Sequence, residues 1–281
     1  MWRRVPLALA LVLAPLSLAA QTQPNWVEGP QTVALGRVAE LDLAEGYLFL
    51  DAEDAQALLE RMGNVPDGSE LGLVTSAVEG ENWFVIFEHS EVGFVKDDDQ
   101  DEIDADAILE GIRDATEASN EVRKEMGVSA IHVVGWEEPP SYDPVTNNLT
   151  WALLGRDDDG GETVNFNVRL LGRKGYMSVT LVEDAQLIAA ARPHLASIVD
   201  SFSYTSGHKY AEFRPGDKVA EYGLVALLAG GAGAAAAKTG LFAAFFKVIA
   251  KAGKAIVVLL VAAVAAIGRV IRALFSTERR A

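Results

Sequence analysis

The sequence predicts an α+β fold in which helices pack on an antiparallel sheet, followed by a C-terminal transmembrane helix or helical hairpin. Three observations predict it. Short strand-like runs recur at the spacing of hairpins, a few separate amphipathic helices lie between them, and long apolar segments are confined to the two chain ends. No long Pro/Ser-rich linker divides Pro24–Phe213, so residues 21–213 are expected to form one domain.

The strands of this domain are predicted from short apolar runs bounded by turn residues. They are expected at residues 33–35, 38–43, 47–50, 71–75, 83–88, 92–95, 131–136, 149–153, 164–170 and 176–181. Pro139-Pro140 is expected to close the strand at 131–136, because proline lacks the N–H that a sheet ladder needs. Strict alternation in the later runs indicates strands with one face turned to a core.

Three helices are predicted between these strands. Asp51 can cap a helix over residues 52–62. Ile108, Ile112, Ala115 and Ser119 recur at helical spacing, which predicts a long helix from about 104 to 126. A last helix is expected over residues 187–198, where Pro193 either kinks it or starts its second half.

Charge is divided unevenly along the 281 residues. Residues 21–218 contain 14 Lys/Arg and 38 Asp/Glu, a net charge of −24, whereas residues 219–281 carry a net charge of +6. A domain this acidic repels phosphate backbones, so nucleic-acid binding is excluded. The absence of cysteine excludes disulfides, thiolate metal sites and cysteine nucleophiles.

The N-terminus has the parts of a secretory signal peptide. Arg3 and Arg4 precede an apolar stretch over residues 7–18, and small residues at Ala19 and Ala20 suit cleavage. Residues 1–20 are therefore predicted to direct export, with an uncleaved anchor as the alternative. The acidic domain is then expected in the periplasm of a bacterium.

The C-terminal region is predicted to hold the chain in the lipid bilayer of the inner membrane. Residues 219–237 contain one charge, Glu221, and approach the roughly 20 residues of a spanning helix. A second apolar segment, residues 241–275, contains a stripe of lysines at 247, 251 and 254. Two arrangements are consistent with this pattern: one span followed by an interfacial amphipathic helix, or a helical hairpin.

Several short stretches resemble a known family. They are Gly29-Pro30, Leu35-Gly36, Gly46-Tyr47-Leu48-Phe49, Gly93 to Asp99, Asn120 with Arg123, Gly135-Trp136 with Pro139, Tyr142-Asp143, Leu149-Thr150-Trp151-Ala152, Asn165-Phe166-Asn167, Leu171-Gly172-Arg173 with Gly175, Asp217 to Ala220, and Tyr222-Gly223-Leu224. Together they resemble the bacterial membrane-anchored proteins grouped as domain of unknown function 2167.

This resemblance implies a membrane-anchored protein and supplies no catalytic residues, since the family has no assigned activity. The order of elements in the second half also resembles PsbP-like α/β/α sandwiches. Folds of that kind serve mostly as binding or assembly modules.

An acidic run at residues 97–104 is a candidate metal site. Asp97, Asp99 and Asp101 alternate like the first three ligands of a calcium loop, but Glu102 and Ile108 occupy positions where that loop needs glycine and glutamate. The alternative is that these carboxylates cap the long helix that follows.

The predicted ligand-binding surface is polar. Asn165, Asn167 and Arg169 share one face of a strand, Asn120 and Arg123 lie about one helical turn apart, and Tyr142-Asp143 follows a proline pair in a predicted loop. If they converge, they could hold a carboxylate, a sugar or a peptide backbone, with arginine as the anion-binding fork. The alternative is that they satisfy loop backbone and sheet edges.

The sequence therefore predicts a non-enzymatic envelope module that binds a protein partner or a small ligand. No cofactor is predicted, and none of the familiar nucleophile, phosphate-loop or zinc motifs occurs. Two alternatives remain: a hydrolase or carbohydrate-acting enzyme that uses paired carboxylates, and a divalent-cation-responsive module.

Overall fold

The alternating runs form two antiparallel sheets in the computed structural model, which describes residues 24–62, 64, 66–125, 127 and 129–228. The strands are β1 (Val27–Glu28), β2 (Gln31–Leu35), β3 (Ala39–Leu43), β4 (Tyr47–Asp51), β5 (Glu70–Ser76), β6 (Phe84–Ser90), β7 (Ile131–Asp143), β8 (Asn148–Asp157), β9 (Glu162–Leu171), β10 (Tyr176–Asp184) and β11 (Phe202–Tyr204). The large sheet has eight strands in the order β1-β4-β5-β6-β10-β9-β8-β7, and the small one has the order β11-β3-β2.

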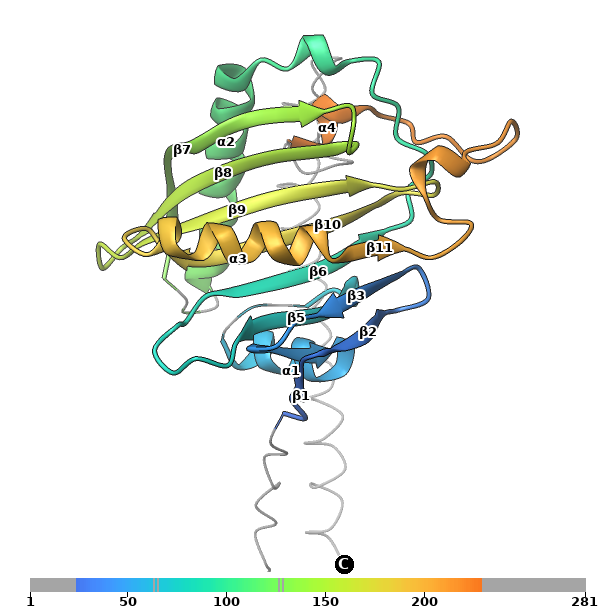
Figure 1. Ribbon diagram of the computed structural model, residues 1–281. Coiled ribbons are helices and arrows are strands. Elements are labelled where there is room, and N and C mark those ends of the chain that lie inside the picture. The colour runs from blue at the N-terminus through green and yellow to red at the C-terminus, as the bar shows by residue number, and fades with distance from the viewer. Residues whose placement is uncertain (1–23, 63, 65, 126, 128, 229–281) are drawn as a thin grey trace, which may run out of the picture.

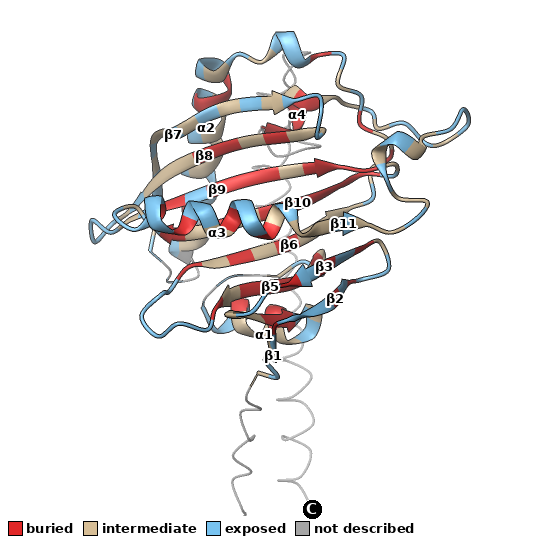
Figure 2. Cartoon of the chain, viewed as in Figure 1, coloured by how far each residue is buried: buried red, intermediate tan, exposed pale blue. Residues whose placement is uncertain are grey.

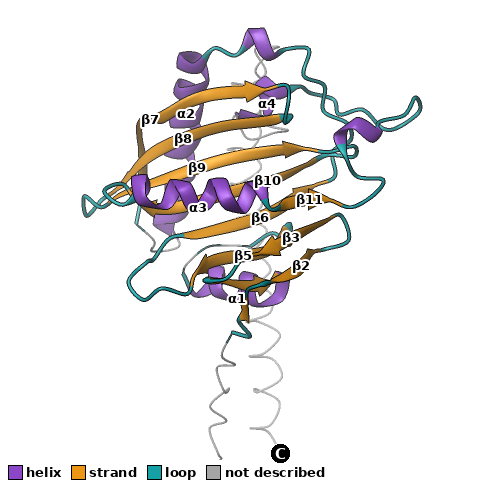
Figure 3. Cartoon of the chain, in the orientation of Figure 1, coloured by secondary structure: helices purple, strands orange, loops and turns teal. Residues whose placement is uncertain are grey.

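Helices cover both faces of the large sheet. They are α1 (Ala52–Arg61), α2 (Ala105–Glu125), α3 (Ile188–Asp200) and α4 (Leu224–Leu228), with single 3-10 turns at Gln100–Glu102 and Tyr210–Glu212. In Figure 1, α3 and the small sheet lie in front of the large sheet, whereas α1 and α2 lie behind it. Figure 3 shows the same arrangement by element type. The predicted α+β class, with helices packed on an antiparallel sheet, is confirmed.

The main core lies between the large sheet, the small sheet and α3. The small sheet contributes Leu35 and Leu41, the large sheet Phe87 and Val179, and α3 Ile198, all at most 2% exposed. Figure 2 shows buried positions concentrated along the central strands and on part of α3. Because strand side chains alternate between faces, the residues between these core positions must face the other side of the sheet.

The other face carries two smaller apolar clusters. Under α1, Ala55 packs with Leu50 and Leu73. Under α2 and α4, Leu149 and Trp151 of β8 pack with other buried side chains, chiefly Ile108, Leu171, Tyr176, Leu224 and Leu227. The predicted N-cap of α1 is confirmed, since the Oδ1 atom of Asp51 accepts the N–H of Asp54 at 3.1 Å.

The prediction that Pro139-Pro140 closes its strand is wrong. β7 continues to Asp143, and its pairing with β8 shifts register between Glu138 and Ser141. Both prolines are tolerated because β7 is an edge strand of the sheet and because its register shift lies at the prolines themselves.

The predicted strand at residues 92–95 is also wrong. Phe94 forms only an isolated parallel bridge with Val219, in which Phe94 N–H donates to Lys218 and its carbonyl accepts from Ala220. Gly93 has φ +104°, and a Cβ there would come within 2.8 Å of the Lys218 carbonyl, so only glycine allows this approach. The loop thus fastens the C-terminal segment to the domain.

Residues 219–228, the first part of the predicted 219–237 span, pack into the domain. Leu224 is fully buried, and Leu227 and Leu228 are no more than 3% exposed. Within the described residues, no helix is long and apolar enough to cross a membrane. The predicted signal peptide at 1–20 and the segments 229–237 and 241–275 lie outside the described residues.

Asp99 holds α4 in place. Its two carboxylate oxygens accept the backbone N–H groups of Leu224 and Val225 at 2.8 and 3.2 Å, and its side chain is itself buried. Gly223 leaves room for this carboxylate, since a Cβ there would meet it at 2.5 Å. The acidic run therefore joins the start of α2 to the end of the described chain.

Replacing Leu224 with alanine should lower the free energy of unfolding by about 2–5 kcal/mol, because it leaves a cavity at a fully buried position. Chemical denaturation of the full chain measures this loss. The control is Val145→Ala, at a side chain that is 87% exposed, where a change within about 0.5 kcal/mol is expected. Equal stability of the two variants would contradict the packing of residues 219–228 in the domain.

Candidate functional site

The alternation of β9 gathers polar side chains on the face opposite the main core. Val164, Phe166 and Val168 point into the main core, so Asn165, Asn167 and Arg169 point toward α2 and α4. Their cross-strand neighbours on β8 are Leu153, Trp151 and Leu149, respectively. The predicted common face of the three polar residues is confirmed.

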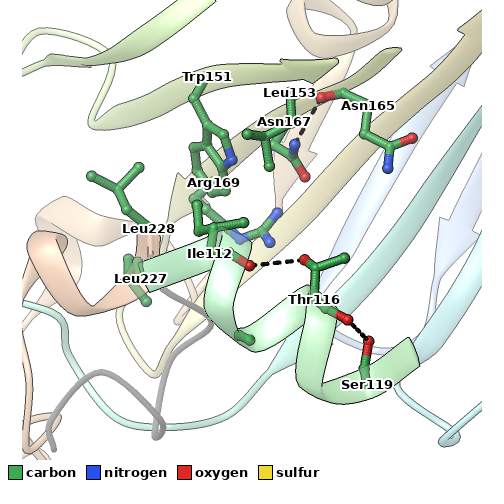
Figure 4. A pocket seen from close by; sticks show the side chains of 11 residues that line it. Ile112, Thr116, Ser119, Trp151, Leu153, Asn165, Asn167, Arg169, Leu227 and Leu228 are labelled. Atoms are coloured by element: carbon green, nitrogen blue, oxygen red, sulfur yellow. Dashed lines mark hydrogen bonds between the residues drawn. The ribbon is translucent and has the colours of Figure 1, made fainter. Parts of the chain in front are cut away.

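These residues line a cavity of about 350 Å³ between the sheet, α2 and α4. Its lining consists of Ile112, Ala115, Thr116 and Ser119 of α2, Trp151 and Leu153 of β8, Asn165, Asn167 and Arg169 of β9, and Leu227 and Leu228 of α4. Figure 4 shows Arg169 lying between Trp151 and the α2 side chains, with the α4 leucines to one side. A volume of this order suits a small ligand, since ligand pockets span roughly 300–1,000 Å³.

The guanidinium of Arg169 is the charged group of this lining. Its Cζ lies 4.9 Å from the centre of the Trp151 ring and 5.8 Å from that of Tyr176. Both distances lie within the range of cation–π attraction to a ring face, which helps to fix the position of the arginine. Its Nε and Nη1 atoms are buried and have no hydrogen-bond partner.

No salt bridge to Arg169 forms within the described part of the chain. Burial lowers the pKa of its guanidinium, while Tyr176 and Glu88 act in the opposite direction. An arginine remains protonated even so. The cavity therefore contains a buried positive charge whose donors are not fully used, which is costly unless an anion completes it.

The neutral polar groups of the lining already form some hydrogen bonds within the domain. Asn167 donates from Nδ2 to the Asn165 carbonyl at 3.0 Å and accepts from Thr180 at 3.3 Å. Thr116 and Ser119 donate their hydroxyl hydrogens to helix carbonyls at 2.8 and 2.7 Å. The hydroxyl oxygens of Thr116 and Ser119 thus remain available as acceptors.

Asn120 and Arg123 do not line this cavity, and their hydrogen bonds stabilise the fold. Asn120 accepts the N–H of Ile131 at 3.0 Å and donates to the Ile131 carbonyl at 2.8 Å, and Arg123 donates to the Ser129 carbonyl at 2.8 Å. Both side chains fasten the start of β7 to α2. Sequence spacing placed them one turn apart but did not show that backbone groups would occupy them.

Tyr142 and Asp143 also have structural partners. The Tyr142 hydroxyl donates to Asp97 at 2.9 Å, and burial together with this hydrogen bond raises the pKa of Tyr142. Asp143 accepts from the backbone of Val145 and the hydroxyl of Thr146, which stabilises the turn between β7 and β8. Neither residue lines the cavity.

The structure does not bring Asp97, Asp99 and Asp101 together as metal ligands. Asp97 binds Tyr142 and Asp99 caps α4, whereas the described residues include no group of three or more His, Asp or Glu side chains that could hold a metal ion. Asp104, at the end of the run, accepts the N–H groups of Asp106 and Ala107 and caps α2. Capping thus accounts for Asp99 and Asp104.

Comparison with protein families identifies the chain. A model of the family described as "Protein of unknown function (DUF2167)" matches residues 27–265. The chain belongs to this family. The predicted family resemblance is therefore confirmed, and the matched range includes the residues that line the cavity.

Other comparisons concern curated proteins and solved structures. None of the curated proteins matches the DUF2167 chain. Among solved structures, it is similar to the solution structure of cyanobacterial PsbP (CyanoP) from Synechocystis sp. PCC 6803, with 11% sequence identity and a TM-score of 0.38, over 69% of this chain and 99% of that one. This likeness concerns the fold alone.

Sequence reasoning missed several cavity residues of the DUF2167 domain. The helical stripe of Ile112, Ala115 and Ser119 identified one wall, but nothing indicated which strand it would face. Leu227 and Leu228 were missed because an apolar, small-residue segment is also typical of a membrane span. Their position at the cavity depends on the capping of α4 by Asp99, a contact between residues far apart in the sequence.

Glu88 lies on the same sheet face, two strands from Arg169, because both residues pair with Ser178 of β10. Burial raises the pKa of Glu88 despite the attraction of Arg169. The folded protein therefore holds the Glu88 proton more tightly than the unfolded chain does. Stability consequently falls as pH rises from the ordinary glutamate pKa, about 4.3, through the raised value.

Replacing Glu88 with glutamine, which imitates the protonated carboxyl, should raise the melting temperature at pH 7 and leave it nearly unchanged at pH 4. Between pH 4 and 8, the melting temperature of the variant should depend less steeply on pH than that of the wild type. Glu60→Gln, at an exposed position of α1, is the control. A variant less stable than wild type at pH 7 would show that Glu88 is needed as an anion, against the burial effect.

Proposed function

We propose that this DUF2167 protein is a membrane-anchored envelope protein whose exported domain binds a small ligand without transforming it. The export signal, the net charge of −24 over residues 21–218 and the apolar C-terminal region support the location. The cavity between β9, α2 and α4 supports the binding role.

The observation that carries the proposal is the buried guanidinium of Arg169, whose hydrogen-bond donors are only partly used. A positive charge has been placed against two aromatic rings at a cavity, with Nε and Nη1 buried and unpaired in the domain. Leaving such a group without partners costs stability, typically about 1–3 kcal/mol or more for a charged group. An anionic ligand beside the guanidinium would offset part of that cost through charge attraction.

The chemistry of the lining favours binding over catalysis. The described lining residues include no Asp, Glu, His or Cys, so the cavity lacks a general acid, a general base and an activated nucleophile. The alternative enzyme with paired carboxylates requires an acidic residue facing Arg169 within the cavity. Glu88 lies two strands away and is not part of the lining.

The membrane anchor is best placed in the apolar residues after Leu228. Residues 219–228 already contribute buried side chains to the domain and cannot also face lipid. The segment at 241–275 and the arginines at 269, 272, 279 and 280 then provide an apolar stretch with a basic cytoplasmic end.

Single cysteines test this topology, because the natural chain has none. Val145→Cys, at a side chain that is 87% exposed, should react with a membrane-impermeant maleimide in intact spheroplasts. A cysteine in place of Ala281 should react only after permeabilisation, as the positive-inside rule requires. Protection of position 145 until lysis would place the domain in the cytoplasm and refute the proposal.

A blocked cavity tests the binding role. Ser119 is an exposed lining residue on α2, so Ser119→Trp should fill the cavity mouth without disturbing a core position. The full chain in nanodiscs is incubated with a low-molecular-mass cell extract, washed and analysed by mass spectrometry for retained compounds. Retention is expected in the wild type and loss in Ser119→Trp.

The matched control is Ala118→Trp, which adds the same side chain at an exposed neighbouring position outside the lining. It should retain the compound. If wild type, control and blocked variant retain the same compounds, or none, the cavity is not a ligand site.

A further inference from the structure

We propose that the cavity is selective for a small monocarboxylate that has an apolar body and an N–H or O–H group. This inference rests on the proposed binding role and names the class of ligand. Three independent features of the lining define the class: one cation, an apolar wall and spare hydroxyl acceptors.

The cation selects the carboxylate. Arg169 is the charged residue of the described lining, and a guanidinium N–H forms a charge-assisted hydrogen bond to a carboxylate. The Trp151 and Tyr176 rings hold the guanidinium in place, so little side-chain freedom remains to be lost when an anion binds.

The surrounding charge limits the ligand to one negative charge. Residues 21–218 have a net charge of −24, and no second Lys or Arg belongs to the described lining. Glu88 also acts on Arg169 electrostatically. A dianion such as phosphate would gain one attractive contact and meet repulsion at its second charge, so a carboxylate is favoured.

The apolar wall selects the body of the ligand. Ile112, Leu153, Leu227 and Leu228 come from α2, β8 and α4 and line the cavity with Trp151. Apolar contacts of this kind stabilise a branched aliphatic or aromatic group by about 25 cal/mol for each Å² removed from water. A fully hydroxylated sugar acid offers no such group.

The hydroxyls of α2 select a hydrogen-bond donor. Thr116 and Ser119 have given their hydrogens to the carbonyls of Ile112 and Thr116, so toward the cavity their oxygens accept. An N–H or O–H on the ligand satisfies them, whereas a second acceptor would not. N-acetyl-leucine combines all three features in one small molecule and serves as the probe.

Calorimetric titration of the full chain in nanodiscs compares N-acetyl-leucine, its neutral amide N-acetyl-leucinamide, isocaproate and inorganic phosphate. N-acetyl-leucine should bind saturably, and the neutral amide at least about tenfold more weakly, because the charge-assisted contact is lost. Isocaproate, which lacks the N–H, should lie between them. Phosphate should not compete.

Arg169→Gln should remove the preference for the acid over the amide, and Ser119→Trp should abolish binding while Ala118→Trp preserves it. Should Arg169→Gln fail to fold, the Ser119→Trp and Ala118→Trp pair decides whether the cavity is the site, and the acid-to-amide ratio in the wild type decides whether charge selects the ligand. Equal affinity for acid and amide, or competition by phosphate, would overturn the inference.

The two proposals fail differently. A compound retained from the extract in the wild type and lost in Ser119→Trp, together with no binding of N-acetyl-leucine, would keep the binding role and reject the monocarboxylate. Absence of both retained compound and probe binding would reject both.

Discussion

Side chains along the central strands alternate between two covered faces, and this alternation sets both the core and the candidate site. Each residue of β9 must suit one of two covered faces: Val164, Phe166 and Val168 fill the main core, and Asn165, Asn167 and Arg169 face α2 and α4. A shift of one residue in register would exchange these sets, placing an arginine in the core and valines at the cavity. Core and candidate site are thus specified by the same pairing.

The buried carboxylate of Asp99 completes the second face. Through Leu224 and Val225 it holds α4, whose Leu227 and Leu228 form one wall of the cavity. The ring of Phe94 stacks on those of Tyr210 and Phe213, with ring centres 4.5 and 4.1 Å apart. These contacts fasten the segment before α4 to the loop that contains Phe94. The wall of the site is therefore also the last described element before the C-terminal region.

Much of this arrangement followed from local sequence. Periodicity located α2 and the paired strands β8 to β10, and it placed Asn165, Asn167 and Arg169 on one face, because those signals act within a few residues. The two missed boundaries depended on distant partners. Pro139 is tolerated because β7 is an edge strand, and residues near Phe94 bind Lys218 and Ala220 instead of extending β6.

Local sequence was enough to predict the α+β class, the acidic character of the domain and the polar face of β9, since each depends on composition or on neighbouring residues. The family was predicted from the resemblance of short motifs spread along the chain. Which polar residues form a site depended instead on contacts between residues far apart in the chain. The fold assigned Asn120, Arg123, Tyr142 and Asp143 to backbone and side-chain partners, and left the Nε and Nη1 atoms of Arg169 without hydrogen-bond partners. It also put residues 219–228 into the domain, because burial depends on what packs against a segment and not on its hydropathy alone.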